Sequence, residues 1–308
     1  MEKKISLIDF TSCPCNDRTY GGNAGRKLGI VYEGENWILK FPGSTAGFDK
    51  TEISYTTSPI SEYIGSHIFS LLGFEVHETK LGIYGNKLVV ACKDFLEDGD
   101  RLLEFRELKN MYTPSIDDSH ASFSGGSGDG TELETILLNI EHNRFLKEMR
   151  EAKQFFWDMF CVDTLIGNSD RNNSNWGIIK KRDGHFVLAP VYDNGNCFNN
   201  KLSVEEIRKK LNNKEAMESS AFRFSLSALR VNGTRLNVFP FILQKENKDC
   251  TNSMIRIAKR IDIKKINEML EEIPMNYGEI VVFHEEYKQF IKEILVLRKE
   301  HIFDKIIG

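Results

Sequence analysis

The chain has 308 residues, enough for one or two domains with a sizeable core. Hydrophobic residues make up 41% of it and charged residues 28%, which is the composition of a soluble globular protein rather than of a disordered or fibrous one. Its formal net charge of −4 gives no reason to expect nucleic acid as the main partner.

The sequence also shows no membrane or export signal. No stretch approaches the roughly 20 apolar residues that span a bilayer. The apolar segment within MEKKISLIDF, at the start of the sequence, is too short for a signal peptide. The six cysteines lack zinc-ligand spacing, and runs such as VVACKDF favour buried free thiols. We therefore expect a cytoplasmic protein, or one that is secreted without a signal peptide, with no membrane partner.

The first hundred residues predict short strands and one helix. KLGIVYEG and NWILKFP, within 27–42, read as two strands joined by a turn, and two more strands are expected in 75–85 and 87–96. Between these pairs, residues 58–74 carry isoleucines at helical spacing, with Pro59 near the start and a glycine at the end. This part of the chain predicts a small β-rich lobe with one helix.

Residues 112–131 concentrate Ser, Gly and Asp and predict a flexible loop. After this loop the pattern changes to helices, and only WGIIKK (176–181) and HFVLAPVYD (185–193) read as strands. The predicted helices cover 131–149, 151–166, 203–213, 263–272 and 284–303. We expect an α+β, bilobal fold with a β-rich N-lobe at 1–97 and a larger, mostly helical C-lobe at 98–308.

Two features of the N-lobe suit phosphate binding. YGGNAGRKLGI (20–30) is a Gly-rich turn between strand-like segments, and glycines let backbone N–H groups approach phosphate oxygens. A plain turn is the simpler interpretation of this segment alone. It is not a Walker A loop, because no Ser or Thr follows the lysine. Lys40 is the one charge in an apolar strand, where a lysine more often turns its ammonium outward. If the predicted helix packs on the strands, Glu62 could hold Lys40 toward a phosphate.

Two acidic motifs follow in the C-lobe. The apolar run FFWDMFCVDTLIG opens into NSDRNNSN, where Asp170 and Asn175 have the spacing D-x-x-x-x-N. A calcium loop is excluded because Asn175 stands at the glycine position and Lys181 at the position of the bidentate Glu. Further on, Asp193 ends a strand-like run in VYDNG. In this order the four features supply the parts of phosphoryl transfer: a phosphate cover, a lysine, a base and two metal ligands.

The same residues carry a resemblance to a known family. LIGNSDRNNSNWGII followed by LAPVYDNGNCF resembles the catalytic core of the HipA-type serine/threonine kinases, in particular their short CtkA-like branch. SPISEYIGSHIFSLLGFEVHETKLGIYGNKLVVACKDF is similar to that branch as well, and the similarity extends over about 5–260. The resemblance implies a protein-kinase-like fold and an ATP- and Mg²⁺-dependent protein serine/threonine kinase that phosphorylates itself and acts as a toxin or effector.

Site roles follow from this resemblance position by position. It implies that Asp170 is the catalytic base, that Asn175 and Asp193 bind Mg²⁺, and that Lys40 contacts the α- and β-phosphates with Glu62 beside it. The loop over the phosphates is expected to be Gly21, Gly22, Asn23, Ala24 and Gly25. The hinge that binds adenine is expected to be Ala91, Cys92, Lys93, Asp94 and Phe95.

Autophosphorylation is expected on a hydroxyl just before the Gly-rich loop, with Thr19 as the candidate, or on Ser122, Ser124 and Ser127. The chain departs from the family pattern at two motifs: Asn172 replaces a histidine, and the DFG-like segment Asp193-Asn194-Gly195 lacks Phe. We also expect it to lack the extra N-terminal domain of full-length HipA. Expected partners are a protein substrate with a Ser or Thr acceptor, and an antitoxin or a host protein.

Two other functions remain open on the sequence. A catalytically inactive nucleotide-binding scaffold would need no base, so the presence of Asp170 with the lysine and both metal ligands argues against it. A lipid or small-molecule kinase could share the D-R-x-x-x-N loop, but the sequence shows no convincing basic membrane-facing patch. The protein substrate and the oligomeric state are not indicated.

Overall fold

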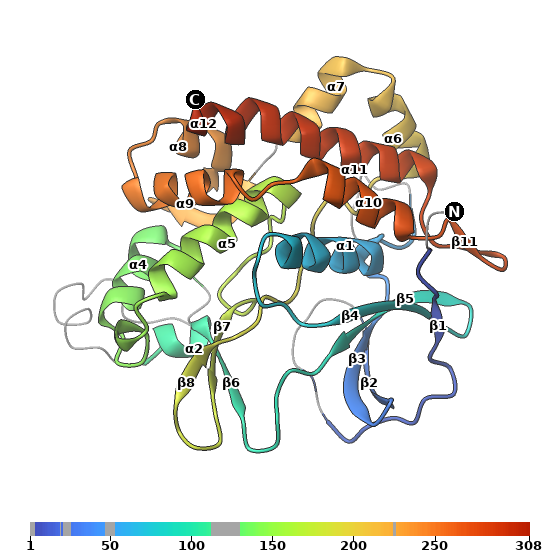
Figure 1. The fold of residues 1–308 in the computed structure, drawn as a ribbon, viewed down its shortest axis with the longest axis horizontal. Helices are drawn as coiled ribbons and strands as arrows, with labels where there is room; N and C mark the ends of the chain where they lie inside the picture. The colour runs from blue at the N-terminus through green and yellow to red at the C-terminus, as the bar shows by residue number, and fades with distance from the viewer. Residues whose placement is uncertain (1–3, 19, 21–25, 47–52, 112–129, 224–225) are drawn as a thin grey trace. The chain divides into compact units, whose positions relative to one another are not determined.

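The computed structural model describes residues 4–18, 20, 26–46, 53–111, 130–223 and 226–308 (Figure 1). They form two compact units, each assembled from separate stretches of the chain. Unit 1 comprises Met1–Phe95, Asp193–Arg223 and Ile261–Glu300. Unit 2 comprises Leu96–Tyr192, Phe224–Arg260 and His301–Gly308. The lobe boundary that the sequence placed at residue 97 stays a prediction.

Unit 1 is built on a five-stranded sheet in the order β1-β4-β5-β3-β2 (Figure 1). The strands are β1 (Ile8–Asp9), β2 (Lys27–Tyr32), β3 (Glu35–Lys40), β4 (Thr79–Tyr84) and β5 (Lys87–Lys93). β1 pairs parallel with β4, and the other pairs are antiparallel. The β2–β3 turn places Glu33 and Gly34 at positive φ, as tight hairpins require.

Alternation along β3 decides which side chains face the core of the sheet. Trp37 and Leu39 join a buried cluster with Phe10, Ile30, Val89 and Ala91. Because neighbouring side chains of a strand point to opposite faces, Lys40 projects from the other face, where it meets helix α1. Lys40, the one charge of this apolar strand, therefore faces polar side chains of α1 and not the apolar cluster.

Helix α1 (Ser58–Leu71) covers that second face and contacts β4 and β5. Pro59 stands in its first turn, Ile60, Ile64 and Ile68 are buried, and Gly73 lies just beyond its end with φ of +87°. The observed helix agrees with the one expected in residues 58–74.

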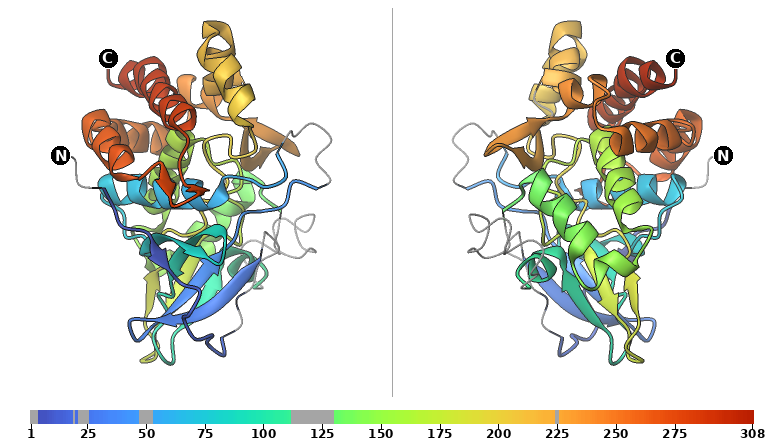
Figure 2. Two further views of the ribbon diagram at one scale, coloured as in Figure 1. Left: turned by 90° about the vertical axis from the view of Figure 1, so that its right-hand side faces the viewer. Right: turned by 90° about the vertical axis from the view of Figure 1, so that its left-hand side faces the viewer.

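The remaining elements of unit 1 come from the later part of the chain. They are α6 (Val204–Leu211), α7 (Lys214–Glu218), a π-helical turn (Ser219–Arg223), α10 (Ile263–Glu272), β11 (Asn276–Tyr277), β12 (Ile280–Val281) and α11 (Glu285–Arg298). A π-helical turn (Lys299–Phe303) follows α11 and contains the boundary between the two units. α10 contacts both α1 and α11, so α1 lies between the sheet and α10 (Figures 1 and 2).

Unit 2 combines a three-stranded sheet in the order β6-β7-β8 with helices and one hairpin. Its elements are β6 (Arg101–Glu104), α2 (Phe105–Lys109), α4 (Leu133–His142), a 3₁₀ turn (Leu146–Glu148), α5 (Ala152–Ile166), β7 (Gly177–Lys180), β8 (Phe186–Leu188), β9 (Leu226–Val231), β10 (Thr234–Asn237), α8 (Val238–Leu243), α9 (Lys248–Ala258) and α12 (Asp304–Ile307). α5 packs against α9.

The prediction that only two strands follow residue 112 is wrong, because β9, β10, β11 and β12 also lie in that part. β9 and β10 are joined by Asn232 and Gly233, both at positive φ, an Asn-Gly hairpin signal that the sequence interpretation overlooked. The helix expected at 131–149 is interrupted, with α4 ending at His142 before the 3₁₀ turn. No helix within the described ranges is both long and apolar enough to cross a membrane.

Candidate active site

Three charged side chains of unit 1 meet at the end of β3. The Nζ atom of Lys40 lies 3.1 Å from Oε2 of Glu62 and 3.0 Å from Oδ1 of Asp193. Lys40 ends β3, Glu62 belongs to α1, and Asp193 returns from much later in the chain. The structure thus brings together three of the residues that the sequence assigned to phosphate and metal binding, and their catalytic roles stay predictions.

Mutual attraction keeps the groups of this cluster charged, although burial opposes their charges. Only 2% of the Glu62 side chain is exposed. Burial by itself opposes ionisation of Glu62, but the nearby Lys40 ammonium and His77 outweigh it and hold the pKa of this carboxyl well below its usual range. Burial also opposes the charge of Lys40, yet Asp193 and Glu62 raise the pKa of Lys40 well above its usual range. Both groups are therefore charged at neutral pH.

His77, which the sequence interpretation missed, lies behind Glu62. Its Nε2 atom is 3.0 Å from Oε1 of Glu62 and 3.2 Å from Oγ of Ser66. Ser66 in turn accepts a hydrogen bond of 2.9 Å from Nδ2 of Asn194, whose backbone N–H donates to Glu62. Because a carboxylate can only accept, this contact is favourable when Nε2 of His77 carries the proton. These hydrogen bonds connect α1 to Asn194, the residue after Asp193. The local sequence VHETK gives no indication of them.

The backbone around Asp193 is held in an unusual conformation. Asp193 has φ of +60°, a left-handed value that is uncommon outside glycine. Helix α1 comes so close that a Cβ atom added at Gly65 would lie 2.8 Å from Cβ of Asn194. Strained residues persist where the surroundings hold them, and such positions cluster at functional sites.

The predicted hinge, Ala91–Phe95, consists of the last three residues of β5 and the two residues that follow the strand. The backbone N–H of Lys93 donates to the carbonyl of Glu78 at 2.8 Å, and that of Asp94 donates to the carbonyl of Asn36 at 2.9 Å. An adenine bound at this stretch would therefore hydrogen-bond to backbone groups other than the N–H groups of Lys93 and Asp94.

The Asp94 side chain anchors the segment that leads to the Gly-rich loop. Its Oδ2 atom lies 2.7 Å from Nη1 of Arg18 and accepts a hydrogen bond of 3.2 Å from the Tyr20 hydroxyl. The loop residues Gly21, Gly22, Asn23, Ala24 and Gly25 and the candidate phosphorylation sites Thr19, Ser122, Ser124 and Ser127 lie outside the described residues.

In unit 2, helix α5 delivers the predicted catalytic loop. The helix ends at Gly167, whose φ of +69° turns the chain away, and the Asn168 N–H returns to the Asp163 carbonyl at 2.9 Å. Oδ1 of Asn168 then accepts the backbone N–H of Asp170 at 3.1 Å. The Asp170 side chain is exposed, as a base that meets a substrate has to be.

A buried ion pair supports this loop from behind. Arg171 donates from Nε and Nη2 to the two oxygens of Asp163 at 2.9 and 3.0 Å, and each side chain is 6% exposed. Burial, only partly offset by Arg171, raises the pKa of Asp163. Nη1 of Arg171 also donates to the carbonyls of Asn175 and Tyr192. The sequence interpretation missed Asp163, although an acid inside the apolar run DMFCVDTLIG needs a buried partner.

The donor chemistry of the predicted metal ligands fits a hard divalent cation such as Mg²⁺, which prefers carboxylate and amide oxygens. Nδ2 of Asn175 donates to the Asp170 carbonyl at 2.7 Å, which orients the amide and leaves its Oδ1 as an acceptor. Asp193 adds a carboxylate. Oδ1 of Asn172 accepts hydrogen bonds from the backbone N–H and the hydroxyl of Ser174 and so braces the loop.

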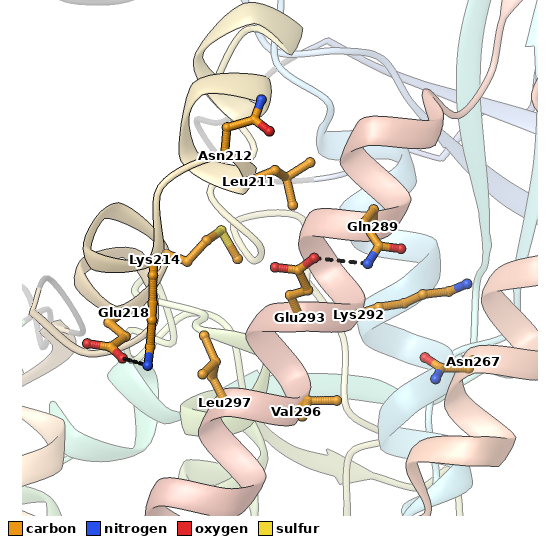
Figure 3. A pocket seen from close by; sticks show the side chains of 11 residues that line it. Leu211, Asn212, Lys214, Glu218, Asn267, Gln289, Lys292, Glu293, Val296 and Leu297 are labelled. Carbon is orange, nitrogen blue, oxygen red and sulfur yellow. Dashed lines mark hydrogen bonds and ion pairs between the residues drawn. The ribbon is translucent and has the colours of Figure 1, made fainter.

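Unit 1 also carries a surface groove of about 540 Å³ beside α11 (Figure 3). Its apolar lining includes Leu211 and Val296, and the charged residues at its edge pair with their neighbours, as Lys214 does with Glu218 at 3.9 Å. None of the residues predicted for the active site lines this groove.

Comparisons with known proteins show the family to which the chain belongs. The model of the HipA-like C-terminal domain matches residues 20–261. The chain is 36% identical, over 303 residues, to the serine/threonine-protein kinase CtkA of Helicobacter pylori strain J99, an alignment that covers 97% of this chain and 87% of the relative.

Two solved structures share the fold. The crystal structure of a Helicobacter pylori proinflammatory kinase CtkA matches with a TM-score of 0.84 and 34% identity, covering 98% of this chain and 97% of that one. HipA from Shewanella oneidensis MR-1, solved in a complex with HipB and operator DNA, matches with a TM-score of 0.52 and 16% identity, covering 95% and 67%, and so supports the fold alone. The chain belongs to the family of HipA-like C-terminal domains, which confirms the family, the α+β kinase-like fold and the kinase class expected from its sequence.

Proposed function

We propose that the chain is a protein serine/threonine kinase that uses ATP and Mg²⁺ and phosphorylates itself. The observation that carries this proposal is the cluster of Lys40, the buried Glu62 and the partly exposed Asp193, with Nζ of Lys40 3.1 and 3.0 Å from the two carboxylates. A lysine held by a helix glutamate, beside an aspartate that can take a metal, is the arrangement that protein kinases use for ATP. The relation to the kinase CtkA supports a Ser or Thr acceptor.

In this proposal Lys40 binds the α- and β-phosphates. Glu62 keeps the ammonium in place because Lys40 and His77 hold its carboxyl in the charged form despite its burial. The segment Gly21–Gly25 covers the phosphates through its backbone N–H groups, and Ala91–Phe95 binds the adenine. Asp193 and Asn175 would hold Mg²⁺, which supplies neutralisation of the phosphate charge when bound.

Asp170 acts as the base. It accepts the proton of the acceptor hydroxyl while the hydroxyl oxygen forms its bond to the γ-phosphorus. The bond between the γ-phosphorus and the β–γ bridging oxygen breaks, and ADP leaves with the electron pair. The Asp170 backbone is held for this task by its N–H, which donates to Asn168, and by its carbonyl, which accepts from Asn175. Arg171 donates to the Asn175 carbonyl and so supports the same loop.

Two alternatives have less support. An inactive nucleotide-binding scaffold would not need an exposed Asp170 on a loop braced by a buried ion pair. A lipid or small-molecule kinase would have to depart from the protein kinase to which the chain is 36% identical. We propose Thr19, Ser122, Ser124 and Ser127 as autophosphorylation sites; an antitoxin or host partner and a cytoplasmic location stay predictions.

The acceptor class can be tested directly. Purified wild-type protein is incubated with γ-labelled ATP and Mg²⁺, alone and with a bacterial extract, and the label is followed separately into protein, lipid and small molecules. We expect acid-stable label on serine and threonine of protein. Label that enters only the lipid or small-molecule fraction would reject the protein-kinase proposal in favour of the second alternative.

A further inference from the structure

The hairpin β9–β10 of unit 2 presents two arginines side by side. Arg230 and Arg235 are direct cross-strand partners, and both are exposed. Directly opposed residues of an antiparallel pair project from the same face, where like charges destabilise the hairpin. An anion that bridges the two guanidinium groups would relieve this repulsion.

The described part of the chain does not supply that anion. Arg230 donates from Nη1 to the carbonyl of Gly233 at 2.6 Å, and Arg235 donates from Nε to the carbonyl of Ser227 at 3.0 Å. Neither arginine has an ion pair among the described residues, and the nearby Glu132 accepts the backbone N–H of Gly233 instead, at 2.9 Å. The two positive charges are therefore not neutralised locally.

Arg235 also reaches the catalytic loop. Its Nη2 atom donates to the carbonyl of Ser169 at 2.8 Å, and Ser169 directly precedes the proposed base Asp170. Among described residues these carbonyls use two of the five N–H groups of Arg235, so three can still face an incoming anion. The paired charges thus lie beside the point at which a protein acceptor would present its hydroxyl.

We propose that Arg230 and Arg235 form an anion-binding site for the protein substrate, which selects acceptors flanked by acidic or phosphorylated side chains. This inference rests on the proposed function and adds a substrate class to it. Guanidinium groups bind carboxylates and phosphates through paired N–H bonds, which makes arginine suited to both. A purely structural role, in which Arg235 only holds the Ser169 carbonyl, would affect all acceptors equally.

The test is a comparison of acceptor peptides with Ser at the centre and Glu, phosphoserine or Gln at the flanking positions. We expect wild type to favour the two anionic sets, and Arg230→Gln or Arg235→Gln to reduce the ratio of anionic to Gln peptides about tenfold, as loss of a charge-assisted hydrogen bond would. Comparison of Glu with phosphoserine tells which anion the site prefers. Lys245→Gln/Lys248→Gln removes two exposed lysine charges from the same unit and serves as the control.

Binding of the same peptides, labelled and followed by fluorescence anisotropy, needs no phosphoryl transfer and separates this inference from the proposed function. Weaker binding of Glu or phosphoserine peptides to the arginine variants supports the site even if no peptide is phosphorylated. An unchanged ratio in both arginine variants, an equal fall for the Gln peptides, or the same loss in the lysine control would overturn it.

Discussion

At the residue scale, the buried carboxylate of Glu62 imposes demands on its neighbours. A charge removed from water is tolerated only when each oxygen has a polar partner. Lys40 serves Oε2, and His77 serves Oε1 at 3.0 Å, so the histidine is part of what keeps the lysine in position. His77 is a positioning residue in this account, because it acts through Glu62.

Replacing His77 by Leu should lower the efficiency of transfer with respect to ATP by roughly tenfold or more, since the lost hydrogen bond involves a charged group. The loss should appear mainly as a higher KM for ATP, and His77→Gln, which keeps an N–H donor, should restore most of it. Transfer rates against ATP concentration give the split between KM and kcat.

The matched control is His67→Gln. His67 lies in α1 and is half-buried, and its Nδ1 atom contacts the Tyr63 carbonyl at 2.8 Å instead of Glu62. An equal rise in KM in this variant, or no rescue by His77→Gln, would show that packing rather than the Glu62 contact is responsible.

The pair of Asp163 and Arg171 is a second case of a buried charge that needs its partner. Asp163→Asn leaves the Arg171 guanidinium buried without a carboxylate, which should cost on the order of 3–5 kcal/mol. Urea unfolding should show a lower midpoint for this variant.

Asp158→Asn on the same helix is the control, because its partner Arg256 is 33% exposed and can turn to water, so its midpoint should change less. Equal shifts would contradict the importance of the Arg171 contact.

At the element scale, the periodicity of apolar residues predicted the helices and strands that depend mainly on local sequence. Helix α1 and strands β2 to β5 follow from the spacing of apolar residues and from turn residues such as Gly34, and the sequence identified them. The hairpin β9–β10 was missed because Arg230 and Arg235 break its apolar pattern, although its Asn-Gly turn was readable. His77 could not be found, because its role depends on a contact with Glu62 that only the packing of α1 creates.

The contact between α10 and α11 makes a prediction about pH. Glu271 in α10 accepts hydrogen bonds from Lys292 and Lys288 of α11, and the Lys292 bond in particular holds its pKa below the usual 4.5. A depressed pKa means that the contact stabilises the fold above about pH 4.5 and that this stability is lost as the pH falls through the folded-state value.

Glu271→Gln should therefore lower the unfolding temperature at pH 7, and the difference from wild type should shrink as the pH is taken well below 4.5. Glu268→Gln in the same helix, where the carboxylate is 62% exposed and 3.9 Å from Lys264, should have little effect at either pH. A difference for Glu271→Gln that stays constant from pH 7 down to pH 3 would contradict the account.

At the scale of the whole molecule, each unit is assembled from distant stretches. The backbone N–H of Ile5 donates to the carbonyl of Glu272 at 2.8 Å, and Asp193 returns to Lys40 in unit 1. No local pattern announces such contacts. The order of motifs and the family resemblance predicted the fold class and the kinase class, whereas the supporting contacts of the candidate site required the three-dimensional structure.

The central claim is that this chain transfers phosphate and does not merely bind nucleotide. The most direct measurement is the Mg²⁺-dependent binding of ATP together with the phosphate incorporated into protein, determined on the same samples of wild type, Asp170→Asn and Asp193→Asn. We predict that Asp170→Asn binds ATP like wild type and loses transfer by a factor of roughly 10² or more, whereas Asp193→Asn loses Mg²⁺-dependent binding as well. Asp183→Asn, in an exposed turn, is the control. Transfer by Asp170→Asn at the wild-type rate, or ATP binding without transfer in wild type, would contradict the account.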